Sequence, residues 1–115
     1  MRDDTQRLLD ILEAIERIER HATKGRGAFA ADELIQTWFT HHLQIIGEAA
    51  RGLTSMFREN YPEAPWKQII GMRNVLVHGY FGVDQDVVWE VIERDLPDLK
   101  DNIVRIIGKS ENSGR

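Results

Sequence analysis

Apolar residues in this chain recur at intervals of three and four positions, and no segment alternates apolar with polar residues. Residues 3–24 show the pattern most clearly, with Leu8, Ile11, Ile15 and Ile18 on one side and charged residues on the other. Because an α-helix has about 3.6 residues per turn, this spacing places the apolar side chains on one stripe. A half-buried strand would need a period of two. The chain is therefore predicted to be all-α.

Capping residues and prolines divide the chain into separate helices. Asp3 or Asp4 can cap the first helix, Asp32 can cap one that runs to about Arg51, and Asp84 can cap the last. The predicted helices cover residues 3–24, 32–51, 53–59, 66–77 and 85–107. The expected fold is a bundle of four main helices plus a short one, with residues 1–108 forming the domain and 109–115 a disordered tail.

Three segments are expected to interrupt or bend these helices. "KGRGAFA", residues 24–30, carries two glycines and is typical of a turn. "NYPEAPW", residues 60–66, carries two prolines and should be irregular. Pro97 should kink the last helix, or restart it with Asp95 near the new cap.

Composition limits the function classes. A chain of 115 residues predicts one domain, small enough that burial against a partner subunit would help its stability. Zero cysteines exclude disulfides and cysteine-ligated zinc, and the charged N-terminus and lack of a long apolar run favour a cytoplasmic protein. The net charge of −4 excludes a general nucleic-acid coat protein, although a small local patch could still bind RNA.

The segment "GMRNVLVHGYFGVD", residues 71–84, concentrates polar groups at the predicted end of a helix. Asn74 and His78 share a helix face, whereas Arg73 lies roughly 140° from His78 and needs a helix end there to reach it. An ordinary structural interpretation is available: a histidine at a helix C-terminus, an arginine paired with an acid, and Tyr80 as a half-buried aromatic. Spacing alone leaves this interpretation open.

The functional interpretation is metal-independent cleavage of a phosphodiester. Histidine exchanges protons near neutral pH, and the planar guanidinium of Arg73 can hold a phosphate that gains charge. Asn74 can orient the histidine or bind a phosphate oxygen. RNA supplies its own nucleophile, the 2′-hydroxyl, so no cofactor or metal is required. A symmetric dimer would provide the second proton-transferring group that one histidine per chain lacks.

Other candidate residues have simpler explanations. His41 and His42 point about 100° apart and form a poor metal pair, so one should face the core and one the solvent. His21 should lie in the last turn of the first helix. The best basic groups for an RNA backbone, each also explicable as a solvated charge, are Lys24, Arg26, Arg51, Arg58 and Lys67. Trp38, Trp66 and Trp89 are most simply core or dimer-interface residues, and no glycine-rich phosphate loop is present.

The chain resembles the HepT-like toxins of the HEPN superfamily. The Arg-Asn-x3-His-x-Tyr signature at residues 73–80 is intact, and the other matching segments are "DILEAIERIER" (10–20), "IIGEAARGL" (45–53), "YPEAPWKQIIGMRN" (61–74) and "VVWEVIERDLPDL" (87–99). The resemblance covers residues 3–107.

This resemblance implies a dimeric helical bundle with the two motifs at a shared cleft. It implies a metal-independent ribonuclease toxin, with Arg73 and His78 as catalytic residues and Asn74 assisting. The partner it implies is a minimal nucleotidyltransferase antitoxin that adds AMP from ATP to Tyr80. Glu48 would support the site by pairing with Arg73, the alternative being an exposed glutamate paired with Arg51 or Arg58. The rival function is a non-catalytic dimer that docks the nucleotidyltransferase.

Overall fold

The structure is a computed structural model that describes residues 3–77 and 84–113, with side chains described at 3–71 and 84–110. All elements in these ranges are helical, which confirms the all-α prediction. In chain order they are α1 (Asp4–Ala22), α2 (Gly25–Ala31), α3 (Glu33–Gly52), α4 (Ser55–Asn60), α5 (Trp66–Val77), α6 (Gln85–Glu90), the π-helical segment η1 (Val91–Asp95) and α7 (Leu96–Ser113).

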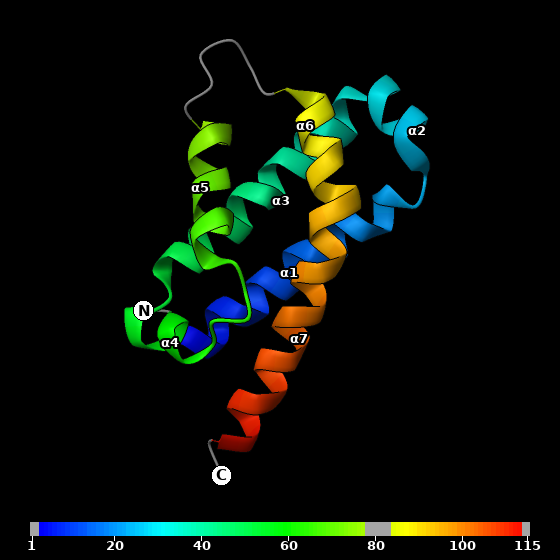
Figure 1. Ribbon diagram of the computed structural model, residues 1–115. Coiled ribbons are helices and arrows are strands. Elements are labelled where there is room, and N and C mark those ends of the chain that lie inside the picture. Colours follow the sequence, from blue (N-terminus) through cyan, green and yellow to red (C-terminus); the bar gives the residue numbers. More distant parts are fainter. Residues whose placement is uncertain (1–2, 78–83, 114–115) are drawn as a thin grey trace.

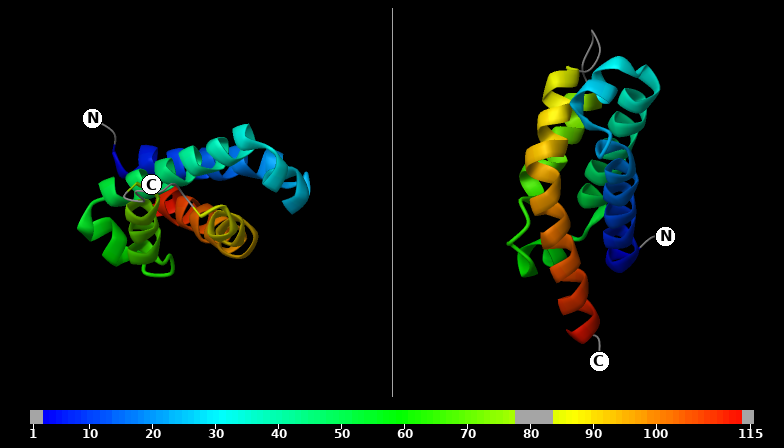
Figure 2. Two further views of the ribbon diagram at one scale, coloured as in Figure 1. Left: turned by 90° about the horizontal axis from the view of Figure 1, so that it is seen from above. Right: turned by 90° about the vertical axis from the view of Figure 1, so that its right-hand side faces the viewer.

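Helix α3 is the centre of the fold (Figure 1). It packs against α1, α2, α5 and α6, while α7 packs against α1. Figure 2 shows α1 and α3 in one layer and the continuous rod of α6, η1 and α7 in a second layer. The α3 side chains Phe39, Leu43 and Ile46 are fully buried, because their spacing of three and four keeps them on the inward face.

The predicted caps are present. Asp3 and Gln6 form a reciprocal capping box on α1, in which the Gln6 amide donates to Asp3 Oδ1 at 2.8 Å and the Asp3 amide donates to Gln6 Oε1 at 3.0 Å. Asp32 accepts from the Leu34 amide at 2.9 Å and so begins α3. Each cap satisfies backbone donors that lack a partner within the helix.

The segment at residues 24–30, predicted as a turn, is mostly helical. The chain reverses at Gly25, whose φ of 90° is the left-handed conformation that suits glycine, and then forms the short helix α2. The helix buries Phe29, whose ring stacks on Phe39 with centroids 5.3 Å apart and meets Trp89 at 5.3 Å. This aromatic contact stabilises a helix that the two glycines alone would disfavour.

Pro97 does not restart the last helix at Asp95. Asp95 lies inside the π-helical segment, and the chain remains helical from Gln85 to Ser113. A proline cannot donate a hydrogen bond to the carbonyl four residues earlier, and the wider π-helical turn before Pro97 accommodates that loss. The predicted tail also needs correction, since α7 is helical through residues 109–113 and Lys109 forms an ion pair with Glu63 at 2.7 Å.

His41 and His42 lie in different environments, as predicted. His41 is exposed, whereas His42 is 3% exposed and its Nδ1 lies 2.7 Å from the Trp38 carbonyl oxygen. Burial lowers the pKa of His42 below 6.5, and the nearby positive groups of His41 and Arg17 lower it further, against the opposing effects of the Trp38 carbonyl and Glu13.

Replacing His42 with glutamine is expected to reduce the loss of stability on acidification. Because the pKa of His42 is lower in the folded state, the unfolded chain binds a proton more readily as the pH falls. This contribution to stability is complete above about pH 6.5 and is lost as the pH falls through the folded-state pKa. Denaturant unfolding above and below pH 6.5 measures it, with His41→Gln as the matched control. Equal pH dependence in wild type and His42→Gln would contradict the expectation.

Candidate active site

The polar segment singled out in the sequence begins on the last turns of α5. Arg73 and Asn74 lie within this helix, which is described as far as Val77. The predicted helix end near His78 falls outside the described residues and stays a prediction. His78 and Tyr80 lie outside the described residues, as do the side chains of Arg73 and Asn74. Their convergence on one phosphate therefore stays a prediction.

The scaffold holds α5 firmly at its start. Trp66 is 7% exposed and its indole Nε1 donates to the Tyr61 carbonyl oxygen at 2.9 Å, while Ile69 is 5% exposed. The helix then packs along α3. The proline-containing segment before Trp66 is irregular, as predicted, and these contacts set the direction in which α5 carries Arg73 and Asn74.

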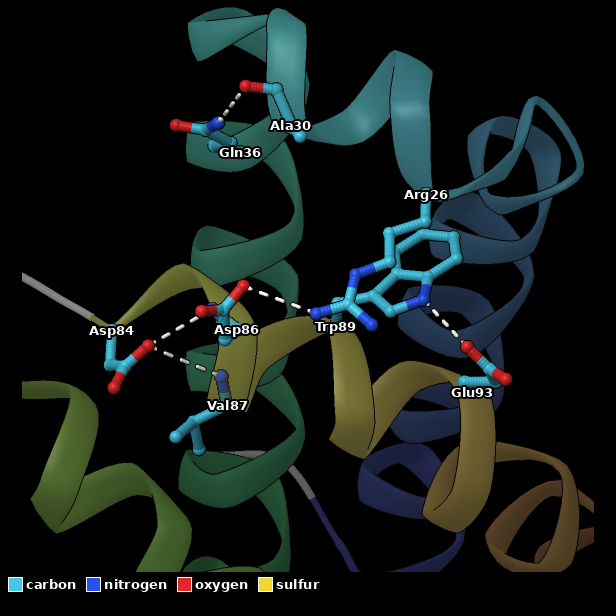
Figure 3. Close-up of polar contacts among 8 residues, drawn as sticks. All are labelled: Arg26, Ala30, Gln36, Asp84, Asp86, Val87, Trp89 and Glu93. Atoms are coloured by element: carbon cyan, nitrogen blue, oxygen red, sulfur yellow. Dashed lines mark hydrogen bonds and ion pairs between the residues drawn. The ribbon is translucent and has the colours of Figure 1, made fainter.

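The chain after the motif is also held in place (Figure 3). The Asp84 carboxylate accepts from the backbone amides of Asp86 at 3.0 Å and Val87 at 3.4 Å, which begins α6 as predicted. Arg26 of α2 forms an ion pair with Asp86 at 3.2 Å, and Trp89 Nε1 donates to Glu93 at 2.6 Å. Helices on both sides of residues 78–83 are thus fixed to the body of the domain.

A polar hollow lies between α3 and the start of α6. It has a volume of about 380 Å³ and is lined by Glu33, Gln36, Thr37, Thr40, His41, Gln44 and Gln85. The side-chain amide of Gln36 donates to the Phe29 carbonyl at 3.0 Å. It also donates to the Ala30 carbonyl at the end of α2, at 3.2 Å (Figure 3). These contacts join α2, α3 and α6 at one end of the bundle.

Glu48 is exposed on α3 and lines a second hollow, of about 350 Å³, with Arg7, Asp10 and His41 among its neighbours. Its predicted contact with Arg73 involves a side chain outside the described residues, so Glu48 as a supporting residue stays a prediction. Packing of α3 against α5 brings the two helices together.

The basic groups named from sequence are separated in the fold. Arg26 pairs with Asp86, Lys24 lies exposed before α2, and Arg51 lies exposed in the last turn of α3. Arg58 and Lys67, by contrast, line one cavity between α4 and α5. Both residues were candidates from the sequence, which carries no signal that they meet, because the irregular segment between them determines how α4 and α5 pack.

Within the part of the chain that the structure describes, no group of three or more histidine or acidic side chains is placed to hold a metal ion. Trp66 and Trp89 are core residues, and Trp38 is half-buried with its Nε1 donating to the Arg17 carbonyl at 3.2 Å. His21 lies in the last turn of α1, as predicted, with its ring edge against Trp38.

Comparison with known proteins identifies the family. The family described as "Ribonuclease HepT-like" matches residues 11–106, a range that contains α5 and the whole Arg-Asn-x3-His-x-Tyr segment. The chain belongs to the HepT-like ribonuclease family. The resemblance noted from sequence is thereby confirmed.

Several relatives of this HepT-like chain are named as ribonucleases. It is 40% identical over 94 residues to the "Probable ribonuclease HepT" of Thermococcus cleftensis, covering 81% of this chain and 86% of the relative. A "Putative RNase" of Methanocaldococcus jannaschii is 38% identical over 103 residues, covering 89% and 94% respectively. The "Gamma-glutamylcyclotransferase and putative RNase" of the same organism is 40% identical over 109 residues, and this chain spans about half of it, 49%.

No solved structure gives a significant match to the chain. Among the described helices of this HepT-like domain, none has the length and apolar character needed to cross a membrane.

Proposed function

We propose that this chain is a metal-independent endoribonuclease that acts as the toxin of a toxin–antitoxin pair. The observation that carries the proposal is the match of residues 11–106 to the HepT-like ribonuclease family, with the Arg-Asn-x3-His-x-Tyr segment intact within it. The place of Arg73 and Asn74 in α5, shortly before the glycines at 79 and 82, supports it, since glycine allows a helix to end where Arg73 and His78 could approach one another.

In the proposed reaction the 2′-hydroxyl of RNA attacks the adjacent phosphorus and the bond to the 5′-oxygen of the next nucleotide breaks. The products are a 2′,3′-cyclic phosphate and a 5′-hydroxyl. Arg73 holds the phosphate oxygens, whose negative charge grows in the transition state, and Asn74 assists. His78 accepts or donates the transferred proton.

The proposed active form is a homodimer in the cytoplasm. One proton must leave the 2′-hydroxyl while another reaches the departing 5′-oxygen, and each chain contributes one motif histidine. A twofold axis that brings two motifs to one cleft supplies both groups. The dimer also offers additional burial to a domain of only 115 residues.

The proposed partner is a minimal nucleotidyltransferase that acts as the antitoxin. The Tyr80 hydroxyl attacks the α-phosphorus of ATP, pyrophosphate leaves, and the phenol proton passes to solvent. Tyr80 then carries a phosphodiester and an adenosine next to the groups that must hold RNA. The added negative charge repels the RNA backbone, which makes the modification an off-switch.

Digestion of RNA by the purified protein in the presence of a chelator tests the proposal. We expect cleavage that the chelator leaves unchanged, and products that end in a cyclic phosphate. Cleavage that stops with the chelator would contradict metal independence. Absence of cleavage under all conditions, together with tight binding of the nucleotidyltransferase, would instead establish the non-catalytic docking dimer.

A further inference from the structure

An open cavity of about 510 Å³ is lined by residues of α4 and of the start of α5. Its lining consists of Ser55, Arg58, Glu59, Trp66, Lys67 and Ile70. The lining therefore combines two cationic side chains, one carboxylate, one hydroxyl and the Trp66 side chain. Positive charge, a hydroxyl donor and an apolar surface together suit a phosphate group of a nucleic acid.

The Nε of Arg58 lacks an acceptor in this cavity. It is buried, and no hydrogen-bond acceptor in the described part of the chain reaches it. Lys67 is exposed, and no described carboxylate lies within ion-pair distance of it. A buried donor without an acceptor is costly, because it has given up its hydrogen bond to water without a replacement. An anion placed between Arg58 and Lys67 would be attracted by the positive charges of both side chains.

Positions 66 and 67, which line the cavity, come seven residues before positions 73 and 74 of the motif. Successive residues of a helix are about 100° apart, so positions seven residues apart nearly coincide in direction. On a regular helix, position 74 is therefore in line with position 67, and position 73 with position 66. The rise of about 1.5 Å per residue places positions 66 and 67 about 10 Å from positions 73 and 74 along the helix axis. An RNA strand running along this side would meet the cavity and the motif in succession.

The walls of the cavity are fixed before any ligand binds. The Thr54 amide and hydroxyl both donate to the Asp4 carboxylate, at 2.9 and 2.8 Å, and so attach the start of α4 to α1. The Thr54 hydroxyl also accepts from the Phe57 amide at 3.1 Å. On the other wall, the indole bond to the Tyr61 carbonyl fixes Trp66. A preformed site loses little conformational freedom when it binds.

We propose that Arg58, Lys67 and Ser55 form a binding site for an RNA phosphate that neighbours the scissile phosphate on the same strand. The proposal rests on the proposed ribonuclease function and adds a subsite to it. Arg58 donates from its guanidinium, Lys67 donates from its ammonium, and the Ser55 hydroxyl is a third donor. The site binds RNA and takes no part in the bond-breaking step.

The first test measures binding separately from cleavage. A single-stranded RNA oligonucleotide is titrated against His78→Ala and against His78→Ala carrying Arg58→Gln and Lys67→Gln, over a range of salt concentrations. We expect about tenfold weaker binding or more in the triple variant. A plot of log affinity against log salt concentration has a negative slope. The magnitude of that slope should decrease by about 0.7 for each phosphate that the variant no longer neutralises. Arg105→Gln in the same background, an exposed arginine of α7 outside the cavity, should match the parent.

The second test uses the length of the substrate with the catalytic residues intact. A dinucleoside monophosphate has only the scissile phosphate, so Arg58→Gln with Lys67→Gln should cleave it at the wild-type rate. A longer oligonucleotide should show a raised KM and a nearly unchanged kcat, and Lys67→Gln alone, at an exposed position, should show part of the effect.

Equal affinity and equal salt dependence of the triple variant and its parent would overturn the subsite. So would an equal loss of affinity in Arg105→Gln, or an equal loss of cleavage on the dinucleotide and the oligonucleotide. Failure of the proposed function has a different signature, because a wild-type protein that binds RNA through Arg58 and Lys67 but cleaves none supports the subsite and contradicts the enzyme.

Discussion

Replacing His78 with alanine is expected to lower the rate of RNA cleavage by about 10²–10⁴-fold, because the variant loses the group that moves the proton. Single-turnover cleavage with a chelator present measures the chemical step directly. The affinity for RNA should change little, since the guanidinium of Arg73 and the other cations are retained. Equal rates for wild type and His78→Ala would contradict the catalytic role.

Companion variants separate the roles within the motif. Arg73→Ala is expected to lose about 10²–10³-fold in rate, through loss of the donors that stabilise the transition-state charge. Glu48→Gln should lose less, because it would only weaken the orientation of Arg73. His41→Ala is the matched control, since His41 is an exposed histidine of α3 outside the motif. Circular dichroism of each variant checks that the helices are intact.

Much of the fold follows from local sequence signals. The aspartates at 3, 32 and 84 have short side chains that accept from amides two or three residues ahead, so they mark helix starts wherever an apolar stripe follows. Helix α3 has a central place because apolar residues occupy more of its circumference than one neighbour requires. These signals act within a few residues and are visible in the sequence.

The errors occurred where distant contacts decide the local structure. Helix α2 forms because Phe29 reaches Phe39 and Trp89, and neither contact is visible in the glycine-rich segment itself. The continuation of α7 past residue 108 is accompanied by an ion pair between Lys109 and Glu63, which are far apart in sequence. The π-helical turn before Pro97 is one of several backbone arrangements that can accommodate a proline.

In the candidate site, too, some features follow from local sequence and others depend on contacts between distant parts of the chain. Residues 73–80 could be named from the sequence, because they match the Arg-Asn-x3-His-x-Tyr signature of the family, whereas their spacing alone left a structural interpretation open. The cavity between Arg58 and Lys67 could not be predicted, since it depends on how the two prolines of the intervening segment direct α5 past α4. A dimer cleft requires a second chain and stays a proposal.

Incubation with its nucleotidyltransferase partner and ATP is expected to add AMP to the wild-type protein and none to Tyr80→Phe, which lacks the attacking hydroxyl. Intact-mass measurement detects each addition. Tyr61→Phe is the matched control, because Tyr61 is the other of the two tyrosines in the chain. Tyr61 is half-buried, and its ring lies against Phe57 with centroids 4.7 Å apart. It should be modified like wild type. If Tyr80→Phe gains as much mass as the wild-type protein, a residue other than Tyr80 accepts the AMP.

The same experiment tests why the modification silences the enzyme. Each AMP group adds at least one negative charge beside Arg73, and two like charges about 4 Å apart repel by roughly 1 kcal/mol in water and more where water is excluded. The added phosphate also competes with RNA for the Arg73 guanidinium. RNA affinity and cleavage rate should therefore fall together in proportion to the modified fraction, whereas unmodified Tyr80→Phe keeps its RNA affinity. If the modified protein binds RNA as tightly as the unmodified one, charge repulsion is not the mechanism, and the adenosine must instead block the reaction after RNA has bound.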